Sequence, residues 1–203
     1  MRMRWPERCL LSTRWRGWLL RKVEVPRVLE SLHLPHQPVC LEIGCGNGIG
    51  ALVVSQWLRP ARLTCVDYDA PMHDKARKVL AHPPQWARDV ETSRIDLVRG
   101  DATRLAFPDG RFDAVFLFGV LHHIHQWPAA IAQVYRVLKP AGVFVFEEAL
   151  MGSSRVLANH FWRHVPFDRE ELQAVLRETG FNVERFEATL AGIWCFVHAR
   201  KPG

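Results

Sequence analysis

Three glycines at alternate positions, Gly44, Gly46 and Gly48, follow a short apolar segment at residues 39–43. Glycine adopts backbone angles that other residues avoid, and it leaves no side chain between the main chain and a ligand. The pattern of residues 50–58 predicts a helix directly after the loop, and the N-terminus of a helix presents unpaired N–H groups. The spacing therefore indicates a ligand-binding loop between a strand and a helix.

Three carboxylates stand where they could contact a ligand held by this loop. Asp67 ends a second apolar segment ~20 residues after the glycines, where a carboxylate can accept both hydroxyls of a ribose. Asp101 follows a third such segment and could accept a bond from an adenine amino group. Glu42 lies next to the loop, where its charge would repel a pyrophosphate and attract an ammonium or a sulfonium. Together they favour an adenosine-containing ligand that carries positive charge.

The glycine spacing alone leaves a dinucleotide open. Counted from Gly44, the third glycine of a dinucleotide fingerprint would stand at position 49, which is Ile49. Counted from Gly46, it would stand at position 51, and Ala51 is an allowed variant there. A phosphate-binding loop is excluded, because no Gly-Lys-Ser/Thr follows.

A histidine cluster follows the apolar segment 112–118, with His122, His123 and His125 close together. An imidazole ionises near neutrality, so all three are candidates for a general base, with His122 and His123 preferred as the catalytic residues. The alternative interpretation is that the histidines only shape the loop. We expect no metal site here, because no carboxylate is spaced nearby in the sequence.

Two further groups could belong to the same region. Glu147 and Glu148 end a fifth apolar segment, and we expect them to face the cleft, or one of them to face solvent. His160 and His164 have the spacing of a zinc pair without its glutamate, so a structural or lid role is expected. Nearby aromatic residues predict an apolar or aromatic substrate pocket: Phe161, Trp162 and Phe167.

Strand and helix patterns alternate along the chain, which predicts a parallel sheet covered by helices on both faces. The expected strands are 39–43, 62–66, 95–99, 112–118 and 142–146, and the expected helices are 50–58, 70–80 and 128–138. After them, Asp168 and Glu171 form a capping box for a helix that ends at Gly180. Residues 181–186 and 192–199 then predict a terminal hairpin.

The chain has 203 residues, enough for one domain. Its net charge is +6, but eight Lys/Arg against three Glu place +5 of it in residues 1–38. We therefore expect residues 1–38 to form a basic, amphipathic cap and residues 39–203 to form the main domain. The longest apolar run, 114–121, is far too short to cross a bilayer, and the basic start lacks the features of a secretory signal. Five cysteines without a CxxC pair indicate a reducing, cytoplasmic setting.

Four segments resemble class I S-adenosylmethionine-dependent methyltransferases, in the type 11-like branch that includes quinone-biosynthesis and small-molecule enzymes. They are VCLEIGCGNG (39–48), TCVDYD (64–69), RGDATRLAFPDGRFDAVFLFGVLHHI (99–124) and VYRVLKPAGVFVFEE (134–148). The resemblance implies an α/β, Rossmann-like doubly wound sheet with order 3-2-1-4-5-7-6 and an antiparallel last strand. It also implies a methyltransferase domain over residues 39–203.

The resemblance further implies S-adenosylmethionine as cofactor, with S-adenosylhomocysteine as product. The methionine moiety would lie against Glu42 and the glycine loop, the ribose against Asp67, and the adenine between Tyr68 and Asp101. The implied cofactor-binding residues are Glu42, Gly44, Cys45, Gly46, Gly48, Asp67, Tyr68, Asp101, Ala102, Phe118 and Gly119. The acceptor is expected to be a small, apolar or aromatic molecule.

Other functions remain open at this point. A nucleic-acid (RNA) methyltransferase is disfavoured, because Phe118-Gly119-Val120-Leu121 stands where base-methylating relatives usually carry Asn/Asp-Pro-Pro-Tyr/Phe. A non-catalytic cofactor-binding protein and a nicotinamide-dependent oxidoreductase are weaker alternatives. Trp15, Trp18 and the basic residues around them could cover the cleft or make peripheral contact with a membrane.

Overall fold

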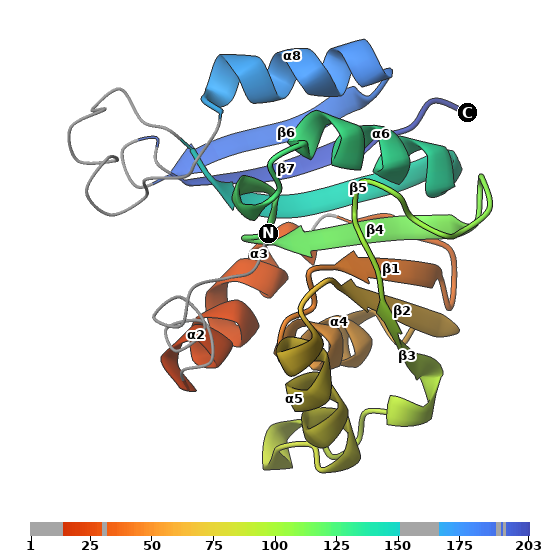
Figure 1. Cartoon of the computed structure of the whole chain (residues 1–203), viewed down its shortest axis with the longest axis vertical. Helices are drawn as coiled ribbons and strands as arrows, with labels where there is room; N and C mark the ends of the chain where they lie inside the picture. Colours follow the sequence, from red (N-terminus) through yellow and green to blue (C-terminus); the bar gives the residue numbers. More distant parts are fainter. Residues whose placement is uncertain (1–13, 30–31, 151–166, 190–191, 193) are drawn as a thin grey trace.

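The computed structural model describes residues 14–29, 32–150, 167–189, 192 and 194–203. Within this part of the chain, the strands form one sheet in the order β3-β2-β1-β4-β5-β7-β6 (Figure 1). β7 runs antiparallel to both of its neighbours, while β1 to β5 pair in parallel. The predicted order and the antiparallel strand are confirmed. The strands are β1(Val39–Ile43), β2(Arg62–Asp67), β3(Ile95–Arg99), β4(Phe112–Phe118), β5(Leu138–Ala149), β6(Asn182–Thr189) and β7(Trp194–Arg200).

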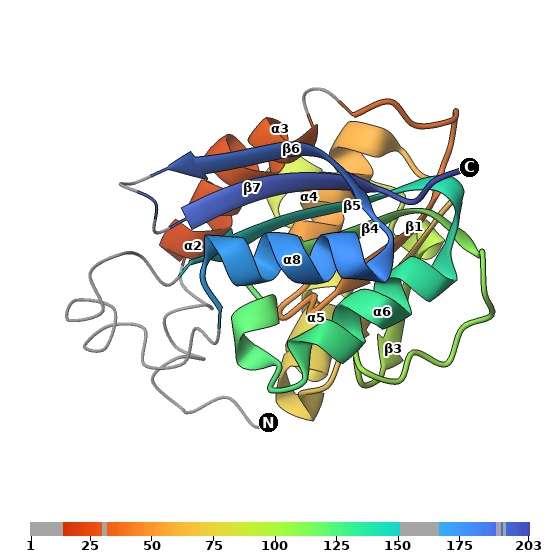
Figure 2. The same cartoon turned by 90° about the horizontal axis from the view of Figure 1, so that it is seen from above.

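Helices cover both faces of the sheet. α6 and α8 lie on one face, and α3 and α4 lie on the other (Figure 2). α5 packs along β2 and β3. The α-helices are α2(Arg14–Leu19), α3(Val25–Leu29), α4(Ile49–Leu58), α5(Ala70–Ala81), α6(Trp127–Val137) and α8(Arg169–Thr179). Shorter helical turns are the π-helical η1(Leu20–Glu24) and the 3-10 turns η2(Gln85–Ala87), η3(Thr92–Arg94) and η4(Leu121–His123).

Strand β4 shows why the core has two halves. Along a strand, successive side chains point to opposite faces. Val115 and Leu117 belong to the cluster under α6 and α8, whereas Ala114 and Phe116 belong to the cluster under α3 and α4. All four are essentially inaccessible to solvent. The apolar run of this strand after Asp113 therefore reflects burial on both faces.

Strand β5 is longer than the predicted 142–146 and spans Leu138–Ala149. At its start, Leu138 pairs with Phe112 across a bulge, so the strand begins where α6 ends. At its end, Glu147 and Glu148 pair with Phe196 and Cys195 of β7. Their charges break the apolar pattern, and only the neighbouring strand shows that the ladder continues.

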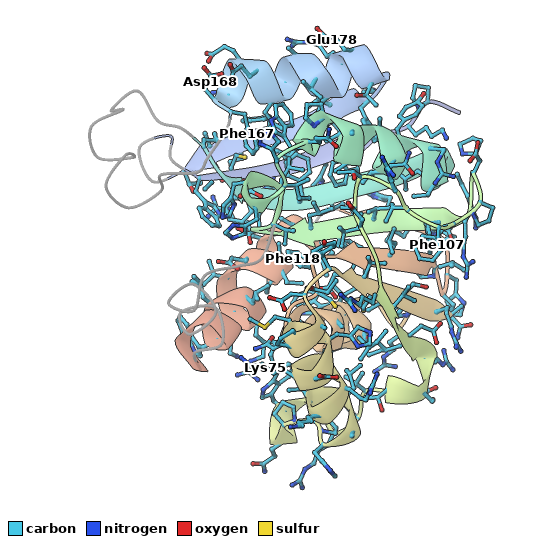
Figure 3. The ribbon with its side chains drawn as sticks, viewed as in Figure 1. Lys75, Phe107, Phe118, Phe167, Asp168 and Glu178 are labelled. Carbon is cyan, nitrogen blue, oxygen red and sulfur yellow. The ribbon has the colours of Figure 1, made fainter. Side chains whose placement is uncertain are left out.

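The C-terminal unit begins at the capping box. The Asp168 carboxylate accepts a bond from the Glu171 N–H at 2.9 Å, and the Glu171 carboxylate accepts one from the Asp168 N–H at 3.0 Å. Figure 3 labels Asp168 at the start of α8. The helix ends at Gly180, whose φ of 101° is left-handed. The cap, the helix end and the following hairpin agree with the sequence prediction.

Candidate active site

The glycine loop after β1 requires glycine at three positions, with φ of +73° at Gly44, +53° at Gly46 and +81° at Gly48. A Cβ on Gly44 would lie 2.4 Å from both methyl groups of Val120. A Cβ on Gly46 would meet nothing closer than the Gly44 carbonyl oxygen at 4.0 Å. The loop therefore packs tightly against Val120 on one side and is open above Gly46.

A cavity of about 400 Å³ lies over this loop. Residues that follow the carboxyl ends of β1, β2, β3 and β4 form most of its wall, which is where parallel sheets bind ligands. Ten of the expected cofactor residues line it: Glu42, Gly44, Cys45, Gly46, Asp67, Tyr68, Asp101, Ala102, Phe118 and Gly119. Gly48 does not line it, because this glycine faces α5, where an added Cβ would lie 3.2 Å from the Ala76 Cβ.

The sequence interpretation missed other residues of the wall. They include the apolar residues Leu20, Ile43, Val66, Met72, Val120 and Ile124, and the polar residues Asn47, Asp69, Thr103 and Gln126. Most stand one or two positions from a predicted residue. Leu20 is different, since it comes from the N-terminal helices and only the folded chain brings it to the cavity.

Asp67 joins the two loops that form the floor of the cavity. Its Oδ2 accepts a bond from the Gly46 N–H at 2.7 Å, and its Oδ1 accepts one from the Asp69 N–H at 2.8 Å. The side chain is largely buried, and this burial is the main cause that raises the pKa of its carboxyl. Each oxygen still has a lone pair for a further donor. Asp67 can thus fix the glycine loop and accept a ligand hydroxyl as well.

Asp101 stands at the carboxyl end of β3 and keeps its charge. Its Oδ1 accepts bonds from the Thr103 N–H and hydroxyl, both at 2.8 Å, and these bonds lower the pKa of the carboxyl. The ring of Tyr68, from the loop after β2, is 54% exposed and lines the same cavity. Asp101 and Tyr68, the two residues that the resemblance assigns to the adenine, thus line the same cavity.

Glu42 differs from the expectation of a negative charge beside the loop. Its carboxyl is buried, which raises its pKa to about 8, although the Cys65 thiol donates to Oε2 at 3.6 Å. A Cβ on Gly50 would lie 2.2 Å from its Oε1, so α4 begins directly against it. Burial therefore favours the protonated form of this carboxyl near pH 7 when no ligand is present. A cation in the cavity would favour the ionised form.

The burial of the Glu42 carboxyl predicts how the stability of the protein depends on pH. The folded protein holds the Glu42 proton up to about pH 8, whereas the unfolded chain releases it near 4.5. The free energy of unfolding should therefore fall as pH rises through this window, by about 1.4 kcal/mol per pH unit from this group. In Glu42→Gln that contribution is absent. The free energy of unfolding of the variant, measured in urea, should therefore rise relative to that of the wild type from pH 5 to pH 8.

The exposed Glu178→Gln is the matched control and should follow the wild type at every pH. If the difference between wild type and Glu42→Gln is the same at pH 5 and pH 8, the buried protonated carboxyl is not present.

The two proposed catalytic histidines occupy different places. His123 lines the cavity, as does His125, whereas His122 is buried behind them with its ring centre 3.9 Å from that of His123. The Nδ1 atom of His122 contacts a carboxylate oxygen of Glu148. No carboxylate stands near the histidines in the sequence, but the fold brings Glu148 to His122 from 26 residues away. Within the described residues, no group of three or more His, Cys, Asp or Glu is placed to hold a metal ion.

Two further expectations were wrong. Glu147 and Glu148 face neither solvent nor the cavity, since both are fully buried and absent from its wall. Phe167 is also fully buried, and its ring packs on Trp127 with centres 4.7 Å apart, so it belongs to the core. His160, His164, Phe161 and Trp162 lie outside the described residues.

The described part of the N-terminal segment packs against the main domain. Val25 and Val28 are fully buried on the α4 face of the sheet. Arg27 pairs with Glu187 of β6, and the Arg27 carbonyl accepts a bond from Arg185 at 3.0 Å. The boundary at residue 38 stays a prediction. Among the described residues, no helix has the length and apolar character of a membrane span.

The chain is similar to known proteins in sequence and in fold. The sequence model of a family described as "Methyltransferase domain" matches residues 41–146. The fatty-acid O-methyltransferase of Mycolicibacterium smegmatis is 33% identical over 109 residues, which cover 54% of this chain and 36% of that protein. A demethylmenaquinone methyltransferase of Leptospira interrogans is 30% identical over 220 residues, covering 93% of this chain and 86% of that protein.

A solved S-adenosylmethionine-dependent methyltransferase from Aquifex aeolicus superposes with a TM-score of 0.76 at 16% identity, covering 98% of this chain and 99% of that one. At that identity the likeness concerns the fold alone. The chain spans only 36 to 47% of the length of three of its curated relatives. The family match covers half of this chain, and the Leptospira relative is matched over most of its length, so the chain belongs to the class I S-adenosylmethionine-dependent methyltransferases.

Proposed function

We propose that this protein transfers a methyl group from S-adenosylmethionine to a small, apolar or aromatic acceptor. One observation carries the proposal. A single cavity joins the loops after β1, β2 and β3, which suit an adenosine-containing cation, to the wall formed by residues 118–126. Donor and acceptor bound in that cavity would meet in one place, and proximity is the main contribution that such a transfer requires.

The residues present fit the cofactor. The space above Gly46 is open, the Asp67 oxygens can each accept one more bond, and the Tyr68 ring is exposed to the cavity. When bound, S-adenosylmethionine supplies an activated methyl group on a sulfonium. Glu42 and the glycine loop would hold its methionine part, Asp67 its ribose, and Tyr68, Asp101 and Ala102 its adenine. Burial of Glu42 provides a carboxyl that becomes charged when a cation is next to it.

The acceptor would lie against the β4–α6 wall. Leu20, Val120 and Ile124 make this part of the cavity apolar, while His123 and His125 add polar groups. Two relatives, a fatty-acid O-methyltransferase and a demethylmenaquinone methyltransferase, support an acceptor with a large apolar part. Trp18 and Val23, 45% and 38% exposed, are consistent with peripheral membrane contact beside Leu20.

The first test is a melting-temperature shift with S-adenosylhomocysteine, S-adenosylmethionine and NAD in parallel. At a hundredfold excess over Kd, a ligand stabilises the folded state by about 2.7 kcal/mol, or ~5–10 °C for a chain of this size. We expect both sulfur compounds to give this shift and NAD to give none. A shift with NAD alone would contradict the proposal.

Acceptor classes are then compared with methyl-labelled S-adenosylmethionine. Myristic acid, a demethylated naphthoquinol and bulk tRNA serve as the three probes. Label in either lipophilic probe is the expected result, whereas label in tRNA alone would favour the nucleic-acid alternative.

A further inference from the structure

The side chain of Glu148 is fully buried, and its carboxylate binds the loop after β4 that forms part of the cavity wall. Its Oε2 accepts a bond from the Leu121 N–H at 2.6 Å and a longer one from the His122 N–H at 3.4 Å. Its Oε1 accepts a bond from the Ala149 N–H at 2.8 Å and contacts Nδ1 of His122. A charge this deeply buried is tolerated only when it is well satisfied by hydrogen bonds, and this one has four nitrogen partners.

The position of Glu148 follows from the sheet. β4 and β5 are neighbours, and Phe118 at the end of β4 pairs with Glu147. The Glu147 carbonyl accepts a bond from the Gly119 N–H at 3.0 Å, and the next residue, Glu148, reaches the loop that leaves β4. The backbone of β5 and the side chain of Glu148 thus both fix this loop, which contains Val120 and His123 of the cavity wall.

The contact with Glu148 favours one tautomer of His122. Three backbone N–H groups already donate to the carboxylate, so it acts as an acceptor toward the imidazole as well. The Nδ1 atom of His122 then carries a proton, and the ring is held in one orientation. The His122 ring packs against the His123 ring at a centre distance of 3.9 Å, and His123 lines the cavity.

We propose that Glu148 is a positioning residue that fixes His122 and, through it, His123, so that His123 takes a proton from a hydroxyl acceptor during methyl transfer. The inference rests on the proposed function. The acceptor O–H bond breaks and its proton goes to the His123 imidazole. The oxygen forms a bond to the methyl carbon, the C–S bond breaks, and its electron pair stays on sulfur as S-adenosylhomocysteine. His123 is only half-buried and can return the proton to solvent.

This arrangement selects a substrate class. A carboxylic acid is already ionised at neutral pH and needs no base, whereas a phenol, a quinol or an alcohol must lose a proton as it is methylated. A general base at His123 would assist only the second kind. We therefore assign a hydroxyl acceptor in preference to a carboxylate.

The positioning role is tested without an acceptor. In protein labelled with ¹⁵N-histidine, His122 should show a protonated Nδ1 from pH 6 to pH 8, with assignments from His122→Asn and His123→Asn. In Glu148→Gln, the side-chain amide keeps the size of the carboxyl but can donate to Nδ1, so the proton should move to Nε2. An unprotonated Nδ1 in the wild type would overturn the inference even if Glu148→Gln does not fold.

The acceptor assignment uses 2-naphthol and 2-naphthoate, which share a ring and differ in the acceptor group. Glu148→Gln and His123→Asn should each lower transfer to 2-naphthol by about 100-fold at pH 7. The loss should shrink at pH values where naphthol is itself ionised, and Glu178→Gln should behave as the wild type. Transfer to 2-naphthoate alone, or to neither probe, overturns the hydroxyl assignment. Binding of S-adenosylhomocysteine is measured separately by calorimetry. If it does not bind, the proposed function is wrong; if it binds, only the hydroxyl assignment is wrong.

Discussion

Replacing Gly44 by alanine is expected to abolish cofactor binding. The new Cβ would lie 2.4 Å from both Val120 methyl groups and 2.9 Å from its Cβ, at a φ of +73°. Overpacking of this kind costs about 1–3 kcal/mol, and a left-handed backbone adds about 1–2 kcal/mol for a residue other than glycine. The glycine loop or the Val120 loop must move, and both line the cavity. The Kd for S-adenosylhomocysteine should rise by about 100-fold or more, as measured by calorimetry.

Gly110 provides a matched control for the backbone contribution. Its φ is +62°, but an added Cβ would meet nothing within 4 Å. Gly110→Ala should therefore lose about 1 kcal/mol of stability and leave the Kd unchanged. Adding Val120→Ala to Gly44→Ala removes the two methyl groups and should restore part of the binding. Equal losses in Gly44→Ala and Gly110→Ala would show that packing against Val120 has no role.

The sequence predicted most of the sheet because local patterns and sheet topology agree. The Gly44 loop, the carboxylate after each of the next two strands, and the Asp168 capping box are all local signals. Each depends on a few neighbouring residues, and a parallel sheet then brings the strand ends together without further information. This is why ten expected residues meet around one cavity.

Two features of the site could not be predicted from the sequence, because they depend on contacts between distant elements. Glu148 reaches His122 only through the pairing of β4 with β5. The protonation of Glu42, a residue of β1, depends on the burial of its side chain against the start of α4. In the sequence both glutamates are charged residues within or at the end of an apolar segment, and nothing local shows how they are buried. Ionisation and pairing are properties of the packed state, so they require coordinates.

Asp67 provides the second large effect, since it serves both the loop and the proposed ribose. Asp67→Ala removes the acceptor of the Gly46 and Asp69 N–H groups together with any bond to a ligand hydroxyl. Hydrogen bonds to a charged group contribute about 1.5–3 kcal/mol, so the Kd for S-adenosylhomocysteine should rise by roughly 10- to 150-fold. Asp96→Ala is the matched control, because its surface pair with Arg62 is 38% exposed on the Asp96 side and should change the Kd little.

A change in affinity alone would not separate the ribose contact from the support of the loop. The two contributions are separated by measuring how the wild type and Asp67→Ala bind the 2′-deoxy form of S-adenosylhomocysteine. If Asp67 binds the ribose, removing the hydroxyl should weaken binding to the wild type and have little further effect on Asp67→Ala, which gives a positive coupling between the two changes. Independent, additive losses would mean that Asp67 acts only through Gly46 and Asp69, and the ribose assignment would then be wrong.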